Sequence, residues 1–118
     1  MSIDKHRQLK DRTKLFALRI IKMSDALPKT RAANVITNQI LRSATSLAAN
    51  YRAVGRARSK AEFLSKLGIV VEEADETVFW LEMLADSGIV QASRMREVLD
   101  EANQLMKIFS ASRRTAKG

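Results

Sequence analysis

Residues 60–84, KAEFLSKLGIVVEEADETVFWLEML, constrain the fold of this chain most, because their apolar positions recur with the period of an α-helix. One row advances by alternate steps of four and three residues: Phe63, Leu67, Val70, Ala74, Thr77, Leu81 and Leu84. A second apolar row lies beside it: Leu64, Val71, Val78 and Ala85. A helix that is apolar around most of its circumference needs neighbours on several sides. We therefore expect this stretch to be the central helix of an all-α protein.

Three further amphipathic segments, at about residues 8–26, 31–54 and 91–113, flank the central helix at 60–86. Short connections between them predict an antiparallel up-down-up-down four-helix bundle, forming a single domain over residues 1–118. One proline and four glycines in the whole chain agree with this all-α fold. The small, basic residues 114–118 are expected to form a flexible tail.

Helix-capping and helix-breaking residues predict where these helices begin and end. Pro28 ends the first helix, and Thr30 is the expected N-cap of the second. Gly55 is typical of a helix C-terminus, where glycine tolerates a left-handed conformation. Ser59, three residues before a glutamate, is the expected N-cap of the central helix, and Gly88 follows its end.

The cellular compartment is predicted from what the sequence lacks. Cysteine is absent, which fits a reducing cytosol. The charged N-terminus has no apolar run behind it, and no stretch approaches the roughly 18 apolar residues of a membrane span. We expect a cytoplasmic protein without a membrane partner.

Positive charge is concentrated in the first half of the chain. The formal charge is +8, from 21 Lys and Arg against 13 Asp and Glu. Residues 1–60 hold 14 basic and 3 acidic side chains, whereas residues 61–86 hold 1 and 7. Basic surfaces favour polyanions such as RNA or DNA. The alternative is that these cations only solubilise the protein or pair with the acidic helix.

A line of polar residues lies on an inward face of the second helix and includes Gln39 and Asn50. Antiparallel pairing with the central helix places Arg42 opposite Glu73 and Gln39 opposite Glu76. We therefore predict an Arg42–Glu73 ion pair within a structural polar seam of five residues: Gln39, Arg42, Asn50, Glu73 and Glu76. An acid–base pair of the two glutamates is the competing interpretation, but their pairing with Arg42 and Gln39 requires no substrate.

The sequence favours a protein that is not an enzyme and needs no cofactor. Di-iron sites in four-helix bundles use Glu-x-x-His motifs, which are absent; the lone His6 is expected to precede the first helix. No histidine in the expected helices can activate a serine or threonine nucleophile. Glycine-rich phosphate loops are absent as well. We predict neither catalytic nor metal-binding residues.

Because no catalytic or metal site is predicted, surfaces that bind other molecules are the remaining candidates for a functional site. Two groups of cations are candidates for contacts with nucleic-acid phosphates, although phosphate contacts alone do not read sequence. They are Arg12, Arg19 and Lys22 on the first helix, and Arg52, Arg56, Arg58 and Lys60 around the second turn. Large apolar residues beyond those that one bundle needs predict an oligomer interface. We assign this interface to Phe79, Trp80 and Met83.

The segments LRSATSLAANYRAVGRARSKAEF and KLGIVVEEADETVFWLEML, with the turn ALPK, resemble the four-helix bundle proteins encoded in intervening sequences of bacterial 23S ribosomal RNA genes. The sequence is also similar to the accessory variability determinant of diversity-generating retroelements. The resemblance covers about residues 15–109. It implies a small bacterial cytosolic protein that assembles as a homopentamer, with no established enzymatic activity.

Two functions follow from these observations as expectations. The first is an oligomeric, non-catalytic bundle that binds RNA or DNA non-specifically through its basic surface. The second is a protein-interaction scaffold, with an unidentified protein partner, whose cations are merely solvated. An enzyme using Glu73 and Glu76 is a third hypothesis, which a deep water-filled pocket at these glutamates would favour.

Overall fold

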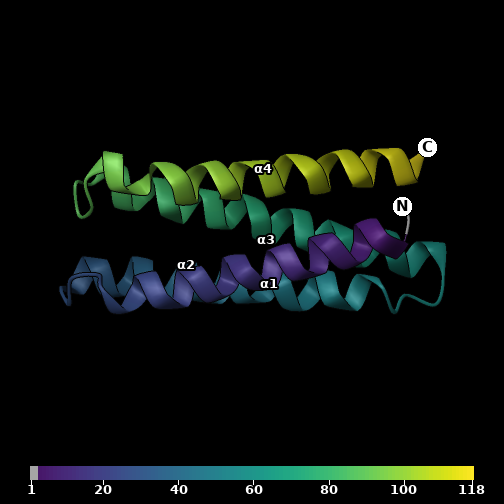
Figure 1. Cartoon of the computed structure of the whole chain (residues 1–118), viewed down its shortest axis with the longest axis horizontal. Coiled ribbons are helices and arrows are strands. Elements are labelled where there is room, and N and C mark those ends of the chain that lie inside the picture. The colour runs from purple at the N-terminus through teal and green to yellow at the C-terminus, as the bar shows by residue number, and fades with distance from the viewer. Residues whose placement is uncertain (1–2) are drawn as a thin grey trace.

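The computed structural model describes residues 3–118. It confirms the predicted antiparallel four-helix bundle (Figure 1). Its helices are α1 (Ile3–Asp25), α2 (Arg31–Val54), α3 (Lys60–Asp86) and α4 (Ala92–Lys117). They lie along the long axis of a particle with extents of 44 × 20 × 20 Å. The α1–α2 turn lies at one end with the α3–α4 turn, and the α2–α3 turn lies at the other end.

The core runs along the whole bundle axis and draws on all four helices. Large, fully buried side chains include Ile20, Leu47, Leu81 and Leu105. The backbones of α1 and α2, of α2 and α3, and of α3 and α4 approach one another closely over the described residues, whereas α1 and α4 lie farther apart. Consecutive helices therefore form the closely packed sides of the bundle.

The predicted helix caps are present. The Thr30 hydroxyl accepts a hydrogen bond from the Ala33 amide, and the Ser59 hydroxyl accepts one from the Glu62 amide at 3.0 Å. Each cap satisfies one of the amides that a helix leaves without an internal partner. Gly88 has a φ of +79°, in the left-handed region that glycine adopts without steric cost.

The first helix begins earlier than expected, and His6 lies within it rather than before it. The His6 ring packs on Tyr51 of α2 with 4.9 Å between ring centroids, and Tyr51 packs on Phe109 of α4 at 4.8 Å. Packing against this aromatic row compensates for the charged, weakly apolar sequence of the first two turns. Periodicity alone missed these turns because their main inward contact is made by a histidine.

Gly55 also differs from its expected conformation. Its φ is −66°, which is ordinary right-handed backbone, so no left-handed cap is formed. The glycine is needed for space instead, since a Cβ atom at this position would overlap Nε2 of His6. The second turn is therefore shaped by the close approach of α1 to the end of α2.

The fourth helix continues to Lys117, so residues 114–117 are helical rather than a flexible tail. Arg113, in the preceding turn, lies across α3, where its Nε donates to the Leu64 carbonyl at 3.5 Å. A Cβ atom on Gly68 would lie 3.1 Å from this Nε. The glycine inside α3 thus accommodates the guanidinium group of a neighbouring helix.

Stability is expected to fall as the pH drops through the titration of His6. Burial, and secondarily the positive charge of Lys10, lower the pKa of His6 below its ordinary value of 6.5. Between the two pKa values the unfolded chain binds more protons, so the free energy of unfolding rises with pH. This contribution is present above pH 6.5 and is lost as the pH falls through the folded-state pKa.

Thermal unfolding of the wild type and of His6→Gln between about pH 7.5 and pH 5 measures this effect, because the range spans the usual titration of histidine. The wild type should lose more stability than the variant over that range. Equal losses would show that His6 is not the titrating group.

Candidate nucleic-acid interface

A groove between α1 and α2 gathers cations on both of its walls. It has a volume of about 430 Å³, and its lining is formed by six residues: Lys10, Asp11, Lys14, Ala48, Ala49 and Arg52. Lys10 and Lys14 are one helical turn apart on α1, so their side chains share a face. We call Lys10, Lys14 and Arg52, with the two alanines between them, the cationic groove.

The cations of the cationic groove have no ion-pair partner in the part of the chain that the structure describes. Among residues 3–118, no carboxylate lies within salt-bridge distance of Lys10, Lys14 or Arg52. Asp11 is the one acidic residue that lines the groove. Because alanine side chains are short, the floor between the walls is low, and an extended anionic chain can approach the helix backbones.

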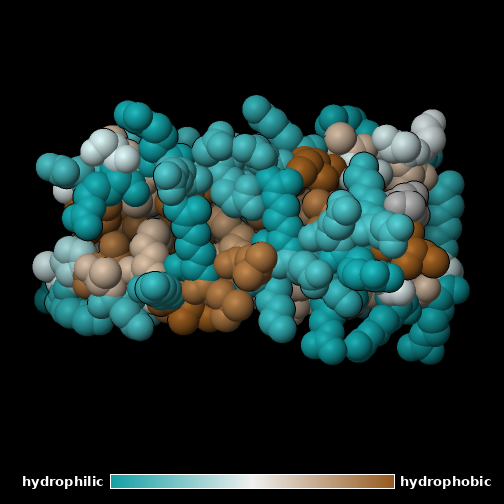
Figure 2. Space-filling view, in the orientation of Figure 1, coloured by the Kyte–Doolittle hydropathy of each residue, from teal (hydrophilic) through white to brown (hydrophobic). Residues whose placement is uncertain are grey.

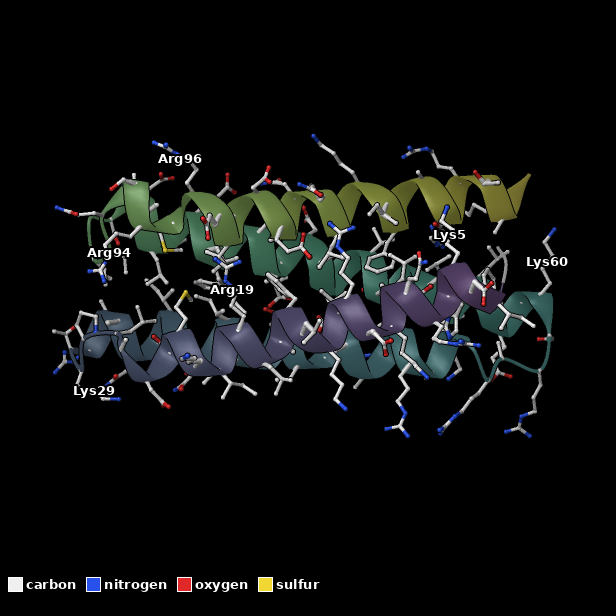
Figure 3. All side chains as sticks on the ribbon, in the orientation of Figure 1. Lys5, Arg19, Lys29, Lys60, Arg94 and Arg96 are labelled. Carbon is white, nitrogen blue, oxygen red and sulfur yellow. The ribbon has the colours of Figure 1, made fainter. Side chains whose placement is uncertain are left out.

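Three more of the predicted cations lie at the same end of the bundle, on the α2–α3 turn and at the start of α3. Arg56, Arg58 and Lys60 are exposed there, and Figure 3 shows Lys60 at the tip of the molecule, remote from Lys29 at the α1–α2 turn. Together with Arg52 in the last turn of α2, they extend the positive charge of the cationic groove around this end.

Two of the predicted cations have a different role in the structure. Arg12 makes a bidentate pair with Glu101 of α4, with Nε at 2.8 Å and Nη2 at 2.7 Å from the carboxylate oxygens. Its Nη2 also donates to Gln104 at 2.8 Å. The hydrogen bonds to Glu101 raise the pKa of Arg12, with burial opposing them. Arg12 thus bridges the widely spaced helices α1 and α4.

Arg19 makes a second bridge of this kind, with Nη2 lying 3.2 Å from an oxygen of Glu97 on α4. Figure 3 places Arg19 between α1 and α4. Lys22 is exposed near the end of α1 and makes no ion pair with the other described residues. The cations chosen from the sequence therefore divide into paired residues and solvent-facing residues.

Sequence reasoning missed Lys10 and Lys14 as binding candidates. The available signal was their spacing of four residues, together with the pair of small residues Ala48 and Ala49 on the second helix. A groove can be predicted from these two features only when the register between the two helices is known. The structure supplies that register through the packing of His6 on Tyr51.

The Arg42–Glu73 ion pair expected from the helix register is present, with 3.3 Å between Nη1 and the carboxylate. The second guanidinium nitrogen, Nη2, donates to Glu76. Gln39 accepts a hydrogen bond from Arg42 Nε at 3.2 Å, so it contacts the arginine rather than Glu76, the partner expected from the sequence. Asn50 donates to Ser46 within its own helix, and so does not reach α3.

Arg42 sets the electrostatics of this polar seam. Its hydrogen bond lowers the pKa of Glu76, and the same interaction raises the pKa of Arg42. Glu73 is only 9% exposed. Because one guanidinium occupies both carboxylates, the arrangement matches a structural ion pair. The buried hydroxyls of Ser43 and Thr77, 3.0 Å apart, continue the polar contact between α2 and α3.

Metal binding and membrane insertion are two further possibilities on which residues 3–118 bear. They contain no cluster of three or more His, Asp or Glu side chains arranged to hold a metal ion. Nor does any of the described helices combine the length and apolar character that crossing a bilayer requires.

The predicted interface residues lie on the outer face of α3. Phe79 is 49% exposed, Met83 is also exposed, and Trp80 is half-buried with its ring edge-on to Phe79 at 4.9 Å. Val35 on α2 and Ile69 on α3 are exposed as well. We call Val35, Phe79, Trp80 and Met83 the α2–α3 apolar patch; Ile69 lies about three helical turns before Phe79 on α3.

The α2–α3 register brings Val35 to this patch. Val35 precedes Arg42 by seven residues, and Met83 follows its partner Glu76 by the same number. Seven residues make about two helical turns, so Val35 lies on the same face of α2 as Arg42, and Met83 lies on the same face of α3 as Glu76. Because the two helices are antiparallel, these equal offsets place Val35 and Met83 at the same height in the bundle. Val35 and Ile69 were not among the interface residues predicted from the sequence.

A second apolar surface lies on the outer face of α1 and was not foreseen. Leu15 is 67% exposed, and Leu18 and Ile21 are exposed one turn and two turns farther along. Figure 2 shows brown, apolar side chains gathered over the middle of α1 among hydrophilic ones. We call these three residues the α1 apolar stripe.

The architecture defines a small all-α protein, a four-helix bundle with a cationic groove and two exposed apolar surfaces. Its sequence matches the model of the 23S rRNA-intervening sequence protein family over residues 5–111, and the chain belongs to that family. This result confirms the resemblance found in the sequence.

A crystal structure of a protein of unknown function from the S23 ribosomal protein family of Bacteroides thetaiotaomicron VPI-5482 is similar to this bundle. The two chains share 32% sequence identity and superpose with a TM-score of 0.84, over 93% of this chain and 98% of that chain. No curated protein matches this chain. The comparisons thus establish family and fold without an activity.

Proposed function

We propose that the protein binds the phosphate backbone of nucleic acid through the cationic groove, without reading base sequence and without catalysing a reaction. The observation that carries this proposal is the set of unpaired cations on both walls of a groove with a low alanine floor. Arg56, Arg58 and Lys60 extend the contact around the α2–α3 turn. We also propose that binding takes place in the bacterial cytoplasm, where RNA and DNA are accessible.

The chemistry of the cationic groove supports backbone contacts rather than base recognition. Lysine and arginine bind phosphate oxygens, and each contact releases counterions from the nucleic acid. None of the residues that line the groove is aromatic, so the groove offers no ring on which bases can stack. The ligand class is therefore polyanionic RNA or DNA of any sequence.

The proposal is tested by fluorescence anisotropy with labelled single-stranded RNA, single-stranded DNA and duplex DNA of unrelated sequences. Binding should be detectable for each and should weaken linearly in a plot of log K against log salt concentration. A constant affinity across the salt series, or no binding, would favour the scaffold function, in which the cations are only solvated.

We propose, as a second function, that the chain assembles with copies of itself, and that the assembly is the homopentamer implied by the family resemblance. The two apolar surfaces favour this proposal, because they lie on different helices. Contact between the α1 apolar stripe of one copy and the α2–α3 apolar patch of the next is heterologous. Such contacts repeat around a ring, and a ring would also multiply weak nucleic-acid contacts through avidity.

Charges placed in the α2–α3 apolar patch are expected to dissociate the assembly. Phe79→Glu combined with Met83→Glu would bury two carboxylates against an apolar partner surface, which is unfavourable without compensating cations. Size exclusion with light scattering should give five times the chain mass of 13.2 kDa for the wild type and one chain mass for the variant.

Ile3→Glu is the matched control, since Ile3 is 80% exposed and lies in neither apolar surface. This variant should remain assembled. A wild type that is monomeric at micromolar concentration would refute assembly, and an assembled Phe79→Glu/Met83→Glu variant would refute the assigned interface.

A further inference from the structure

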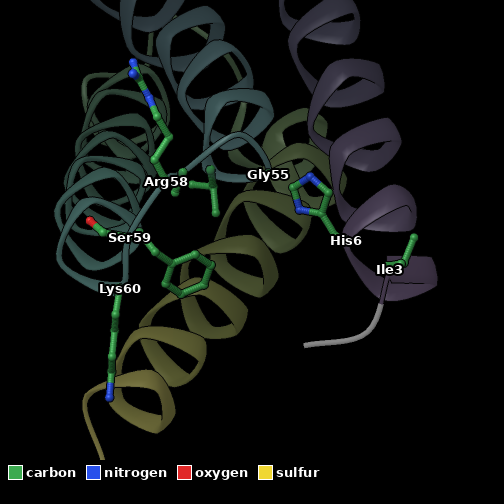
Figure 4. Close-up of a pocket in the computed structure, with 9 residues that line it drawn as sticks. Ile3, His6, Gly55, Arg58, Ser59 and Lys60 are labelled. Atoms are coloured by element: carbon green, nitrogen blue, oxygen red, sulfur yellow. The ribbon is translucent and has the colours of Figure 1, made fainter.

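A pocket of about 620 Å³ opens at the end of the bundle that carries the α2–α3 turn (Figure 4). It lies between the first turns of α1, the end of α2 and the start of α3. We call it the end pocket. Its volume is within the range of small-molecule sites, about 300–1,000 Å³. Neither the polar seam nor the cationic groove shares a residue with it.

The end pocket has apolar walls drawn from all three of these segments. Ile3 comes from α1, Val54 from the end of α2, Ala57 from the turn and Phe63 from the first turn of α3. Val54 is fully buried, and Phe63 is half-buried against the core. Such walls favour an organic group over a bare inorganic ion, because burial of apolar surface is favourable.

The polar lining of the end pocket is positive. Arg58 and Lys60 lie at its rim, and none of the residues that line it is acidic. Figure 4 shows these two side chains leaving the α2–α3 turn in opposite directions, with their charged ends pointing away from the space between the turn and His6. Both side chains are long and exposed, so a change of rotamer brings either charge toward an anionic ligand in the end pocket.

The start of α3 adds hydrogen-bond donors to this charge. The Glu62 amide donates to the Ser59 hydroxyl and the Phe63 amide donates to the Ser59 carbonyl. The amides of Lys60 and Ala61 have no partner among the described residues. Free amides at the positive end of a long helix complement a carboxylate.

His6 forms the remaining wall and is held in place. Its ring is fixed by packing on Tyr51 and by its close approach to Gly55. The imidazole lies on the side of the pocket opposite the turn, as Figure 4 shows. His6, Val54 and Phe63 are thus positioned by packing, whereas Ile3 is an exposed side chain at the edge of the space.

We propose that the end pocket binds a small organic carboxylate whose apolar body lies against Val54, Ala57 and Phe63. The carboxylate is held by Lys60 or Arg58 and by the free amides at the start of α3. This ligand differs from nucleic acid, because a phosphate backbone has no apolar body to fill the walls. The two proposals share Arg58 and Lys60 but are tested separately, because octanoate binding is measured without nucleic acid and the cationic groove lies outside the end pocket.

The test uses octanoate as the probe and the full chain as the protein. Calorimetry should detect saturable binding of octanoate. Its affinity should be at least about tenfold higher than that of acetate, which lacks the apolar body, and that of octanol, which lacks the negative charge. In NMR spectra the largest shifts should fall on His6, Gly55 and Phe63. A bound anion should also raise the pKa of His6 in an NMR titration, because negative charge favours the imidazolium form.

Two kinds of variant locate the site. Ala57→Trp should fill the pocket and abolish binding, whereas Arg58→Gln with Lys60→Gln should weaken octanoate about tenfold without changing octanol. The matched control, Arg96→Gln with Lys107→Gln, removes the same charge from α4 and should bind normally. If circular dichroism shows that Ala57→Trp does not fold, the comparison between the two charge variants still tests the proposal.

Three results would overturn the proposal. They are the absence of saturable octanoate binding, equal affinity for octanoate and octanol, and shifts confined to the α1 apolar stripe or the α2–α3 apolar patch. The last result would assign the binding to exposed apolar surface outside the end pocket.

Discussion

Replacing Lys10, Lys14 and Arg52 together with glutamine is expected to weaken nucleic-acid binding on the order of a hundredfold at about 0.1 M salt. Each phosphate contact contributes about 0.7 to 0.9 to the slope of log K against log salt concentration. Losing three contacts should therefore reduce the magnitude of that slope by about 2 to 3. Anisotropy titrations at several salt concentrations measure both quantities, and the change should be the same for unrelated sequences.

A control variant separates the position of the charges from the net charge. Arg96, Lys107 and Arg114 are exposed on α4, and their replacement with glutamine removes the same total charge. Figure 3 shows Arg96 pointing outward from α4, away from the α1–α2 pair. This control should retain most of the affinity. Equal losses in both variants would mean that net charge, and not the cationic groove, drives binding.

The second large effect is expected at the polar seam. Replacing Arg42 with methionine leaves the nearly buried carboxylate of Glu73 without its cation, and an unpaired polar group of this kind costs about 2 kcal/mol. For a domain of this size, the melting temperature should fall by roughly 6 to 10 °C. Thermal unfolding near neutral pH measures the change. The half-exposed Glu76 contributes less, since water screens its contact with Arg42.

The double variant Arg42→Met/Glu73→Gln tests whether this loss comes from the stranded charge. Removing the negative charge should recover part of the stability, so the two substitutions should be non-additive. If Arg42→Met alone leaves the melting temperature unchanged, Glu73 does not depend on its cation. An acid–base role for Glu73 and Glu76 would then regain support.

The sequence was most informative where local chemistry and the helix period agree. The apolar rows of residues 60–84, the caps Thr30 and Ser59, and the left-handed Gly88 are all local features, and the structure contains them. The Arg42–Glu73 pair was also predictable, because a short turn fixes the register of consecutive helices.

Features that depend on helices distant in sequence were not predictable in this way. Arg12 and Arg19 resemble free surface cations in the sequence, and their partners Glu101 and Glu97 are identified only by the α1–α4 register. The overlap that explains Gly55 likewise involves His6, which is remote in the chain. Long-range geometry therefore decided which candidate cations remain available to a ligand.

The pairs made by Arg12 and Arg19 are expected to influence the order in which the helices separate. Three boundaries between helices are formed by close backbone approach, whereas α1 and α4 are farther apart and bridged by these partly exposed ion pairs. Salt screens exposed ion pairs, while kosmotropic salts strengthen apolar burial. Local opening in concentrated salt should therefore begin with α1, giving this helix the fastest amide hydrogen exchange. Since α1 carries one wall of the cationic groove and the whole α1 apolar stripe, a ligand on either surface would slow that exchange.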